Sequence, residues 1–459
     1  MTITDATMAS DRADDFSNQC ALDWDGLVLG MGPTYESGLQ PVSIDPECSA
    51  LALGPPRIGK TSTMIIPNVL NAPGAVVTTS TKREVMNATL SWRAAIGTCY
   101  IFDPLGEMPL PSGAVELRWS PIVGCERYEV AESMAHALVS SARPGALSAE
   151  AKHWIDQSRA LLAPVLHAAA LAGRSMEDVI EWVLTRDVRD PQAILIAAGA
   201  KLAKMTLRSV VTAEERERSG IFSTSSTLLS ALRSESTLAA AARPNFDAEH
   251  FATGYGTVYI CAPTEAQEQL SPLIVAIIDQ IRRAVYRRKA KFPDAAPVVF
   301  ALDEVAHIAP LPYLPALAAE GAGQGLLTLA CMQDLSQARH IWGAQADGFM
   351  SLFGATVAFP GIKDPKTLEL ISQLAGEVLT PMVSVSQPDV FAALSGKGFA
   401  SATTSFTWRR RLPVDAIANA PKGTALLIAQ SHTPEWIRTV PYDMAGQWAG
   451  HGGSSSKLR

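Results

Sequence analysis

The chain has 459 residues, which is too many for one ordinary hydrophobic core, so we expect two or more domains. Hydrophobic residues make up 47% of the sequence and charged residues 18%, which is the profile of a folded globular protein and excludes a disordered one. The formal net charge of −7 argues against a protein that is basic over its whole surface and coats nucleic acid. It is still compatible with a local basic channel.

The remaining bulk features indicate a cytoplasmic protein. The six cysteines are scattered without a Cys-x-x-Cys pair, so the sequence predicts free thiols in a reducing cytosol rather than a disulfide framework. The N-terminus is polar and acidic, unlike a secretory signal. The sequence contains no run of about 18 apolar residues, which is what a transmembrane helix would require. We expect residues 1–40 to be a loosely ordered lead-in and residues 448–459 to be a flexible tail.

The first strong motif lies between a strand-like run and a helix-like segment. Ala50-Leu51-Ala52-Leu53 is suited to a buried strand, and residues 61–66 can open a helix. Between them the sequence reads Gly54-Pro55-Pro56-Arg57-Ile58-Gly59-Lys60-Thr61, followed by Ser62, which contains a complete P-loop motif. The glycines let the backbone curl so that its N–H groups point at phosphate oxygens. We expect residues 54–62 to bind a nucleoside triphosphate; the alternative is a chance match on a Gly/Pro turn.

Within this motif, two side chains have specific expected roles. Lys60 would reach the β- and γ-phosphates and assist catalysis, and the Thr61 hydroxyl would be a Mg²⁺ ligand. The sequence therefore predicts ATP and Mg²⁺ as cofactors.

The segments after the P-loop alternate between strand and helix patterns and then change character. Residues 75–79 and 98–102 are strand-like, and residues 82–95 are helix-like. From residue 125 to residue 245 the sequence becomes rich in Ala, Leu, Glu and Arg, and amphipathic helices are expected at 132–141, 153–172 and 197–208. A strand pattern returns at 255–261. We therefore expect one nucleotide-binding domain, formed by residues 41–124 and 246–447, with an all-α domain inserted at 125–245.

A second motif supplies the carboxylates that a P-loop requires. Residues 298–302 form a β-branched and aromatic run that ends in Asp303 and Glu304, as expected for a buried parallel strand that delivers acids at its C-terminal edge. Asp303 would hold Mg²⁺, and Glu304 would orient or deprotonate the attacking water. The alternative is that Asp303 caps the helix that follows.

A further buried strand is expected at 326–332, and it ends at Gln333. Gln333 is a candidate sensor of the γ-phosphate, with an ordinary turn hydrogen bond as the equal alternative. Upstream, Ser271-Pro272 is expected to begin a helix that ends in a cluster of basic residues, which are Arg282, Arg283, Arg287, Arg288, Lys289 and Lys291. Cations that complement a helix C-terminus are the simpler interpretation of this cluster, and contact with DNA or membrane phosphates is the alternative.

The order of several sequence blocks resembles one family, the type IV secretion coupling proteins, which are TraG-like ATPases of conjugative DNA transfer. The blocks, in addition to the P-loop, are Ile65-Ile66-Pro67-Asn68-Val69-Leu70, Thr78-Thr79-Ser80-Thr81-Lys82-Arg83-Glu84, Ile101-Phe102-Asp103-Pro104, Arg118-Trp119-Ser120-Pro121, His153-Trp154, Leu302-Asp303-Glu304, Met332-Gln333-Asp334-Leu335-Ser336-Gln337, Phe359-Pro360-Gly361-Ile362-Lys363-Asp364 and Leu412-Pro413-Val414-Asp415. The resemblance runs from about residue 45 to residue 445.

This resemblance implies an α/β fold, a RecA-like P-loop NTPase sheet with an inserted all-α domain, and assembly as a hexamer. It also implies ATP-driven recruitment and transfer of DNA, single-stranded and bound to a relaxase, or of protein substrates, to the components of a type IV secretion channel. The expected place of action is the inner face of the cell membrane.

Two features depart from the family pattern. Family members usually carry N-terminal transmembrane helices, which this sequence lacks, so a membrane-protein partner is one expectation. Ala322 and Gln324 stand where relatives often have arginines, which puts one catalytic contribution in doubt, and Arg233 or Arg339 could substitute. Two alternatives therefore stay open, an FtsK/HerA-type DNA translocase outside secretion and a nucleotide-dependent docking adaptor that pumps nothing.

Overall fold

The computed structural model describes residues 26–33, 39–106, 109–140, 149–386, 401–430 and 432–445, and its centre is a twelve-stranded mixed sheet. Residues 1–25 of the expected lead-in and the expected tail at 448–459 lie outside the described residues. The strands of the sheet lie in the order β2-β1-β14-β13-β10-β3-β9-β8-β4-β7-β5-β6, and a separate ribbon is formed by β11 and β12. The strands are β1 (Val28–Pro33), β2 (Leu39–Ser43), β3 (Ala50–Leu53), β4 (Val76–Ser80), β5 (Cys99–Phe102), β6 (Ala114–Glu116), β7 (Thr257–Cys261), β8 (Val298–Leu302), β9 (Leu326–Met332), β10 (Ala355–Ala358), β11 (Glu377–Ser386), β12 (Ser401–Arg410), β13 (Thr424–Ala429) and β14 (Glu435–Arg438).

The eight strands from β10 to β6 are parallel, whereas the other four, β13, β14, β1 and β2, continue the sheet with antiparallel pairing. The strands β3, β4, β7, β8, β9 and β10 are buried over their whole length, as expected for a parallel sheet with both faces covered. The fold class expected from the sequence is confirmed: the protein has an α/β fold.

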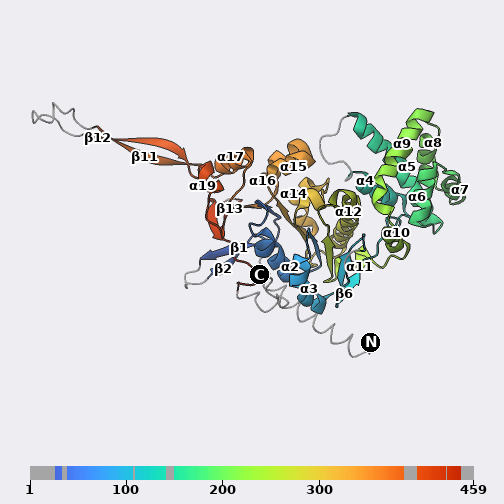
Figure 1. Cartoon of the computed structure of the whole chain (residues 1–459), viewed down its shortest axis with the longest axis horizontal. Helices are drawn as coiled ribbons and strands as arrows, with labels where there is room; N and C mark the ends of the chain where they lie inside the picture. Colours follow the sequence, from blue (N-terminus) through green and yellow to red (C-terminus); the bar gives the residue numbers. More distant parts are fainter. Residues whose placement is uncertain are drawn as a thin grey trace, which may run out of the picture.

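Helices cover both faces of the sheet (Figure 1). One face packs on α2 and α3, and the other packs on α12 and the short helices that follow it. The helices associated with the sheet are α2 (Ile66–Asn71), α3 (Glu84–Ile96), α11 (Ala248–Thr253), α12 (Gln267–Lys291), α13 (Val305–Ile308), α14 (Leu314–Glu320), α15 (Leu335–Trp342), α16 (Phe349–Leu352), α17 (Pro365–Leu374) and α19 (Val414–Ala418).

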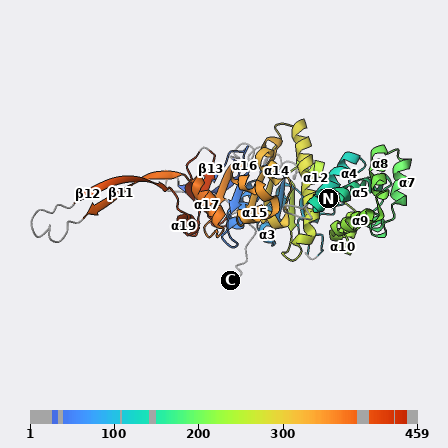
Figure 2. The ribbon, with the colours of Figure 1, turned by 90° about the horizontal axis from the view of Figure 1, so that it is seen from above.

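The segment between β6 and β7 contains helices joined by loops and, among the described residues, no strand. Its helices are α4 (Tyr128–Ser140), α5 (Ala149–Leu171), α6 (Met176–Thr185), α7 (Arg189–Ala197), α8 (Lys201–Val211), α9 (Glu215–Leu228) and α10 (Glu235–Ala242). They pack around α5 and lie at the end of the molecule opposite the β11–β12 ribbon (Figures 1 and 2). Within the described ranges, no helix is long and apolar enough to cross a membrane.

Three expectations about local structure are wrong. Residues 28–33 and 39–40 belong to strands rather than to a loose lead-in, because the buried amide of Asn68 bonds both the N–H and the carbonyl of Val28 at 2.8 Å. The helix expected at 197–208 is interrupted, because the chain turns at Gly199 with a φ of +67°. Helix α12 begins at Gln267 rather than at Ser271, and it includes Pro272, which lacks only the N–H that would bond the carbonyl of Glu268.

Deletion of residues 125–245 tests our proposed domain division. We expect the remaining protein to keep binding an ATP analogue, because every strand of the sheet lies outside this segment in the described residues, while DNA stimulation of ATP hydrolysis is lost. The measurements are titration with a fluorescent ATP analogue and hydrolysis with and without DNA, after circular dichroism has confirmed a folded protein. A folded deletion protein that no longer binds nucleotide would contradict the division.

Candidate active site

The P-loop connects β3 to a helix whose first turn, Thr61–Ile65, is π-helical and continues as α2. The loop leaves the sheet beside β9, where the Gly54 N–H donates to the Met332 carbonyl at 3.2 Å. Gly54 approaches its neighbour closely, because a Cβ there would lie 2.7 Å from the Phe359 Cβ. Gly59 has a φ of +106°, a conformation that other residues rarely adopt. The two motif glycines therefore meet different requirements, close approach at Gly54 and backbone conformation at Gly59.

The other loop residues complete a cradle at the start of the helix. Pro55 and Ile58 are half-buried and Pro56 and Arg57 are exposed, with Arg57 in the left-handed region at a φ of 63°. The Ser62 hydroxyl donates to the Gly59 carbonyl at 3.2 Å. A helix N-terminus that follows a tight loop presents free N–H groups and favours an anion, so these residues fit a phosphate group.

Lys60 is buried at the mouth of this cradle. Its ammonium group donates hydrogen bonds to the carbonyls of Gly54, at 2.5 Å, and of Pro55, at 3.1 Å. The charge is thus held against the loop by backbone oxygens. The loop therefore offers a cation where the sequence motif predicts contact with the outer phosphates.

Asp303 meets the P-loop at the C-terminal end of β8. The Thr61 hydroxyl donates to Asp303 Oδ2 at 2.6 Å, which joins the two residues predicted to hold Mg²⁺ although they are far apart in the chain. On the neighbouring strand β4, the Thr79 hydroxyl donates to the Asp303 carbonyl at 2.8 Å and fixes the backbone there. Burial raises the pKa of Asp303, and the Thr61 hydrogen bond and the charge of Lys60 oppose that rise. A hydroxyl and a carboxylate at hydrogen-bond distance form a donor set of the kind that Mg²⁺ prefers.

The alternative role of Asp303 as a helix cap is not what the structure shows. The residue at the cap of α13 is Glu304, and its side chain makes no capping bond. Asp303 Oδ1 accepts only the N–H of Glu304, at 3.1 Å.

Glu304 occupies a strained position directly after the strand. Its φ of 49° and ψ of 45° are left-handed, which is uncommon for a residue with a side chain and concentrates at functional sites. Burial alone would raise its pKa, but His307, whose Nδ1 lies 3.8 Å from Glu304 Oε2, and the charge of Lys60 outweigh burial and lower it. Gln333 contributes in the same direction. The Glu304 carboxylate is therefore ionised at neutral pH, as a base must be.

Gln333 lies at the same edge of the sheet because β9 runs between β3 and β8. Its backbone N–H donates to Gln337 Oε1 at 2.9 Å, which is the turn hydrogen bond that the sequence left open. Its side chain is close enough to lower the pKa of Glu304. Both features coexist, and its role as a phosphate sensor stays a prediction.

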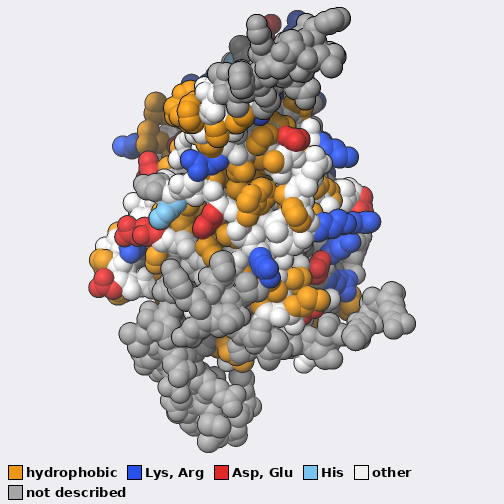
Figure 3. Space-filling model, turned by 90° about the vertical axis from the view of Figure 1, so that its left-hand side faces the viewer, with side chains coloured by type: hydrophobic (Ala, Val, Ile, Leu, Met, Phe, Trp, Pro, Cys, Tyr) orange, Lys and Arg blue, Asp and Glu red, His pale blue; other side chains and the backbone are white. Residues whose placement is uncertain are grey.

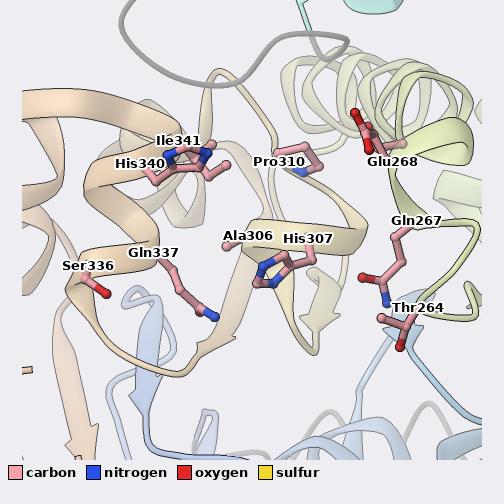
Figure 4. Close-up of a pocket in the computed structure, with 11 residues that line it drawn as sticks. Thr264, Gln267, Glu268, Ala306, His307, Pro310, Ser336, Gln337, His340 and Ile341 are labelled. Carbon is pink, nitrogen blue, oxygen red and sulfur yellow. The ribbon is translucent and has the colours of Figure 1, made fainter. Parts of the chain in front are cut away.

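A cavity of about 630 Å³ is lined by residues of α12, α13 and α15, and His307 is among them. His307 and Gln337 extend into it from α13 and α15 (Figure 4).

Thr79 and His307 are the residues that the sequence analysis missed. Thr79 lies in one of the family-like blocks, and His307 follows Glu304 by three residues, a spacing that allows side-chain contact in a helix.

The basic cluster at the end of α12 is largely engaged within the chain. Arg282 and Arg283 both bind the buried carboxylate of Asp279, at 2.7 and 2.6 Å. Arg287 pairs with Glu249, and the buried Arg288 donates to the backbone carbonyls of Ala252 and Ala296. These contacts favour the structural interpretation of the cluster over phosphate binding.

The two arginines considered as substitutes for the missing pair are also engaged. Arg339 pairs with Asp347 at 2.8 Å and with Asp364 at 3.1 Å, and Arg233 donates to the carbonyl and the hydroxyl of Ser226. Within this chain, Arg339 would have to break two ion pairs before it could reach a phosphate.

A family model described as type IV secretory system conjugative DNA transfer matches residues 14–442. The chain belongs to this family. The resemblance seen in the sequence blocks is thereby confirmed. No curated protein sequence matches the chain significantly.

Solved structures of one coupling protein share the fold. The unbound monoclinic form of the bacterial conjugative coupling protein TrwBdeltaN70 has 18% sequence identity, with 94% of this chain and 92% of that chain covered and a TM-score of 0.69. TrwB in complex with ADP and Mg²⁺ has 18% identity, with coverage of 94% and 93% and a TM-score of 0.66. TrwB in complex with the ATP analogue ADPNP has 19% identity, with coverage of 87% and 86% and a TM-score of 0.64.

Proposed function

We propose that this conjugative DNA transfer family protein is a Mg²⁺-dependent ATPase that couples ATP hydrolysis to DNA transfer. The observation that carries the proposal is the contact between Thr61 and Asp303 at 2.6 Å, with Lys60 and Glu304 beside it. Phosphoryl transfer needs a cation for the outer phosphates, Mg²⁺ ligands and a group that positions water, and these residues supply all three. The reported complexes of TrwB with ADPNP and with ADP and Mg²⁺ support the choice of nucleotide and metal.

Each residue then has a role in the chemistry. The N–H groups of residues 57–62 bind the phosphates, and Lys60 leaves the loop carbonyls to neutralise the β- and γ-phosphates. Thr61 and Asp303 would hold Mg²⁺, which would supply positive charge beside the phosphates. Glu304 orients the attacking water and accepts its proton, with His307 and Gln333 placing its carboxylate.

We propose a ring of identical subunits, a hexamer, as the working assembly. The 3₁₀ turn Ala322–Gln324 immediately precedes β9, so it lies at the N-terminal end of the parallel strands, whereas the P-loop lies at their C-terminal end. In the head-to-tail ring that we propose, this end of the sheet in one subunit would face the P-loop of the next. The side chain of Lys289 reaches this turn, because a Cβ at Gly325 would lie 3.3 Å from Lys289 Cδ. Its ammonium group donates to the Pro293 carbonyl, so Lys289 would have to leave that contact before it could act as the cation at the position where relatives carry arginine.

Assembly should control the rate. We expect the isolated chain to hydrolyse ATP slowly, because a monomer lacks a neighbour's cation, and to accelerate when it oligomerises on DNA. The measurement is turnover per subunit over a range of protein concentrations, with assembly state followed by analytical ultracentrifugation. Fast turnover by a monomer, independent of concentration and of DNA, would contradict the ring.

The same assay, with and without single-stranded DNA, tests the function. Stimulation by DNA supports a motor that receives a relaxase-bound strand and passes it to the secretion channel at the inner face of the membrane. Ala322 and Gln324 stand where relatives often have arginines. The absence of arginine at these two positions favours a second candidate, a docking adaptor that binds ATP and recruits substrate. Tight ATP binding with no turnover under any condition would support the adaptor instead.

A further inference from the structure

The peptide group that joins Asp303 to Glu304 is held at both ends. Its carbonyl oxygen accepts a hydrogen bond from the Thr79 hydroxyl at 2.8 Å, and its N–H donates to Asp303 Oδ1 at 3.1 Å. The paired part of β4 and β8 ends at Thr79 with Leu302, so this carbonyl lies one residue beyond the paired strands. A side chain, rather than the backbone of a neighbouring strand, therefore fixes the peptide group.

The orientation of this peptide group determines where the Glu304 side chain points. Glu304 has a left-handed φ of 49° and ψ of 45°, which a residue with a side chain keeps only where its surroundings impose it. Its carbonyl accepts the N–H groups of His307 and Ile308, at 2.9 and 3.0 Å, and these bonds stay within the turn. Rotation of the peptide group would change φ of Glu304 and move its carboxylate, whereas the Asp303 carboxylate is bound separately by Thr61.

Thr79 is placed to prevent this rotation. Its side chain is fully buried, and of the hydrogen bonds just described, its bond is the one that ties the backbone of the turn to another strand. Because a buried carbonyl that loses its donor is costly, the bond resists movement of the oxygen. The adjacent Thr78 is also buried, on the opposite face of the sheet, but its hydroxyl has no hydrogen-bond partner among the described residues. Two neighbouring threonines therefore differ in this contact.

We propose that Thr79 is a positioning residue for ATP hydrolysis, whose hydroxyl holds the strained Asp303–Glu304 peptide group so that the Glu304 carboxylate faces the attacking water. Thr79 acts through Glu304 rather than through contact with the nucleotide. The inference rests on the proposed function, because it takes Glu304 as the residue that orients water. It adds a requirement on β4, which lies outside both the P-loop and the acidic motif.

The test is Thr79→Val, which keeps the size of the side chain and removes the hydrogen bond. We expect the maximal rate of hydrolysis to fall about two- to tenfold, the range for the loss of one hydrogen bond. The Mg²⁺ concentration needed for half-maximal ADPNP binding should stay unchanged, because Thr61 still binds the Asp303 carboxylate. Thr79→Ser, which keeps the hydroxyl, should retain the parent's rate. In a Glu304→Gln background, Thr79→Val should cause no further loss.

A second readout does not depend on hydrolysis. Hydrogen exchange of the full chain without nucleotide should become faster at residues 304–308 in Thr79→Val, because the turn loses its bond to β4. Thr78→Val makes the same change at a buried hydroxyl that has no partner among the described residues. Thr407→Val makes it at an exposed position of the β11–β12 ribbon, at the end of the molecule that faces the viewer in Figure 3. Both controls should match the parent in rate and in exchange.

Three results would overturn the proposal. They are parent-like hydrogen exchange at residues 304–308 in Thr79→Val, a loss of activity in Thr79→Ser as large as that in Thr79→Val, and losses in Thr79→Val and Glu304→Gln that add in the double variant. Thr79→Ala, which also lacks the hydroxyl, takes the place of Thr79→Val if that variant does not fold. A parent chain that hydrolyses no ATP would instead contradict the proposed function, and hydrogen exchange would still decide this inference.

Discussion

Lys60→Ala is expected to abolish ATP hydrolysis and to weaken nucleotide binding by about 10- to 100-fold. A hydrogen bond to a charged partner contributes roughly 1.5–3 kcal/mol, which sets the loss in binding. The loss in turnover is larger, on the order of 10²–10³-fold, because a preorganised cation stabilises the charge that develops in the transition state. Within the P-loop motif Lys60 is the cation that faces the cradle, since Arg57 is exposed.

The binding measurement is calorimetry with ADPNP and Mg²⁺, and hydrolysis is followed by phosphate release. Lys201→Ala is the matched control, because Lys201 is exposed on α8 in the helical segment. Unchanged turnover in Lys60→Ala would mean that the P-loop does not bind the reacting phosphates. Lys60 bonds only the loop's own carbonyls in this structure, so Lys60→Ala should keep its thermal stability. The expected losses of binding and turnover would then not come from unfolding.

Much of the site could be predicted from the sequence because its residues stand at strand ends. A buried apolar run followed by Gly54 or by Asp303 predicts both the strand and the edge at which its last residue lies. Residues at the C-terminal ends of β3, β8 and β9 then meet because those strands are neighbours. The order of neighbouring strands could not be predicted from the residues, since it depends on crossovers and on long-range packing.

The parts that could not be predicted depend on contacts between distant segments. The sequence predicts a loosely ordered lead-in at residues 1–40, yet Gly30 is a position of close approach, where a Cβ would lie 2.7 Å from Ile437 Cδ1 of β14. Thr79 gave no local signal of its contact with the Asp303 carbonyl. The β11–β12 ribbon alternates apolar and hydroxyl residues, a pattern that predicts strands but not that they leave the sheet.

Glu304→Gln is expected to keep ATP binding within a few-fold of the parent and to lower turnover by about 10²–10⁴-fold, the range for loss of a general base. The amide matches the carboxylate in size but cannot accept a proton from water. Because the pKa of Glu304 is lowered from its ordinary value of 4.5, the carboxylate stays ionised down to acidic pH. If Glu304 sets the acid limb of the parent's pH profile, turnover should fall only below that value, and Glu304→Gln should lack this limb.

Two comparisons make the role of Glu304 specific. Asp303→Asn should instead raise the Mg²⁺ concentration needed for half-maximal nucleotide binding, because Asp303 bonds Thr61 and would lose a ligand charge. Glu320→Gln, at an exposed position on α14, should leave both turnover and binding unchanged. Single-turnover hydrolysis and ADPNP binding over a Mg²⁺ series distinguish the three variants. Normal hydrolysis by Glu304→Gln would assign water activation to another group, and His307, 3.8 Å from the same carboxylate, would then be the next residue to test.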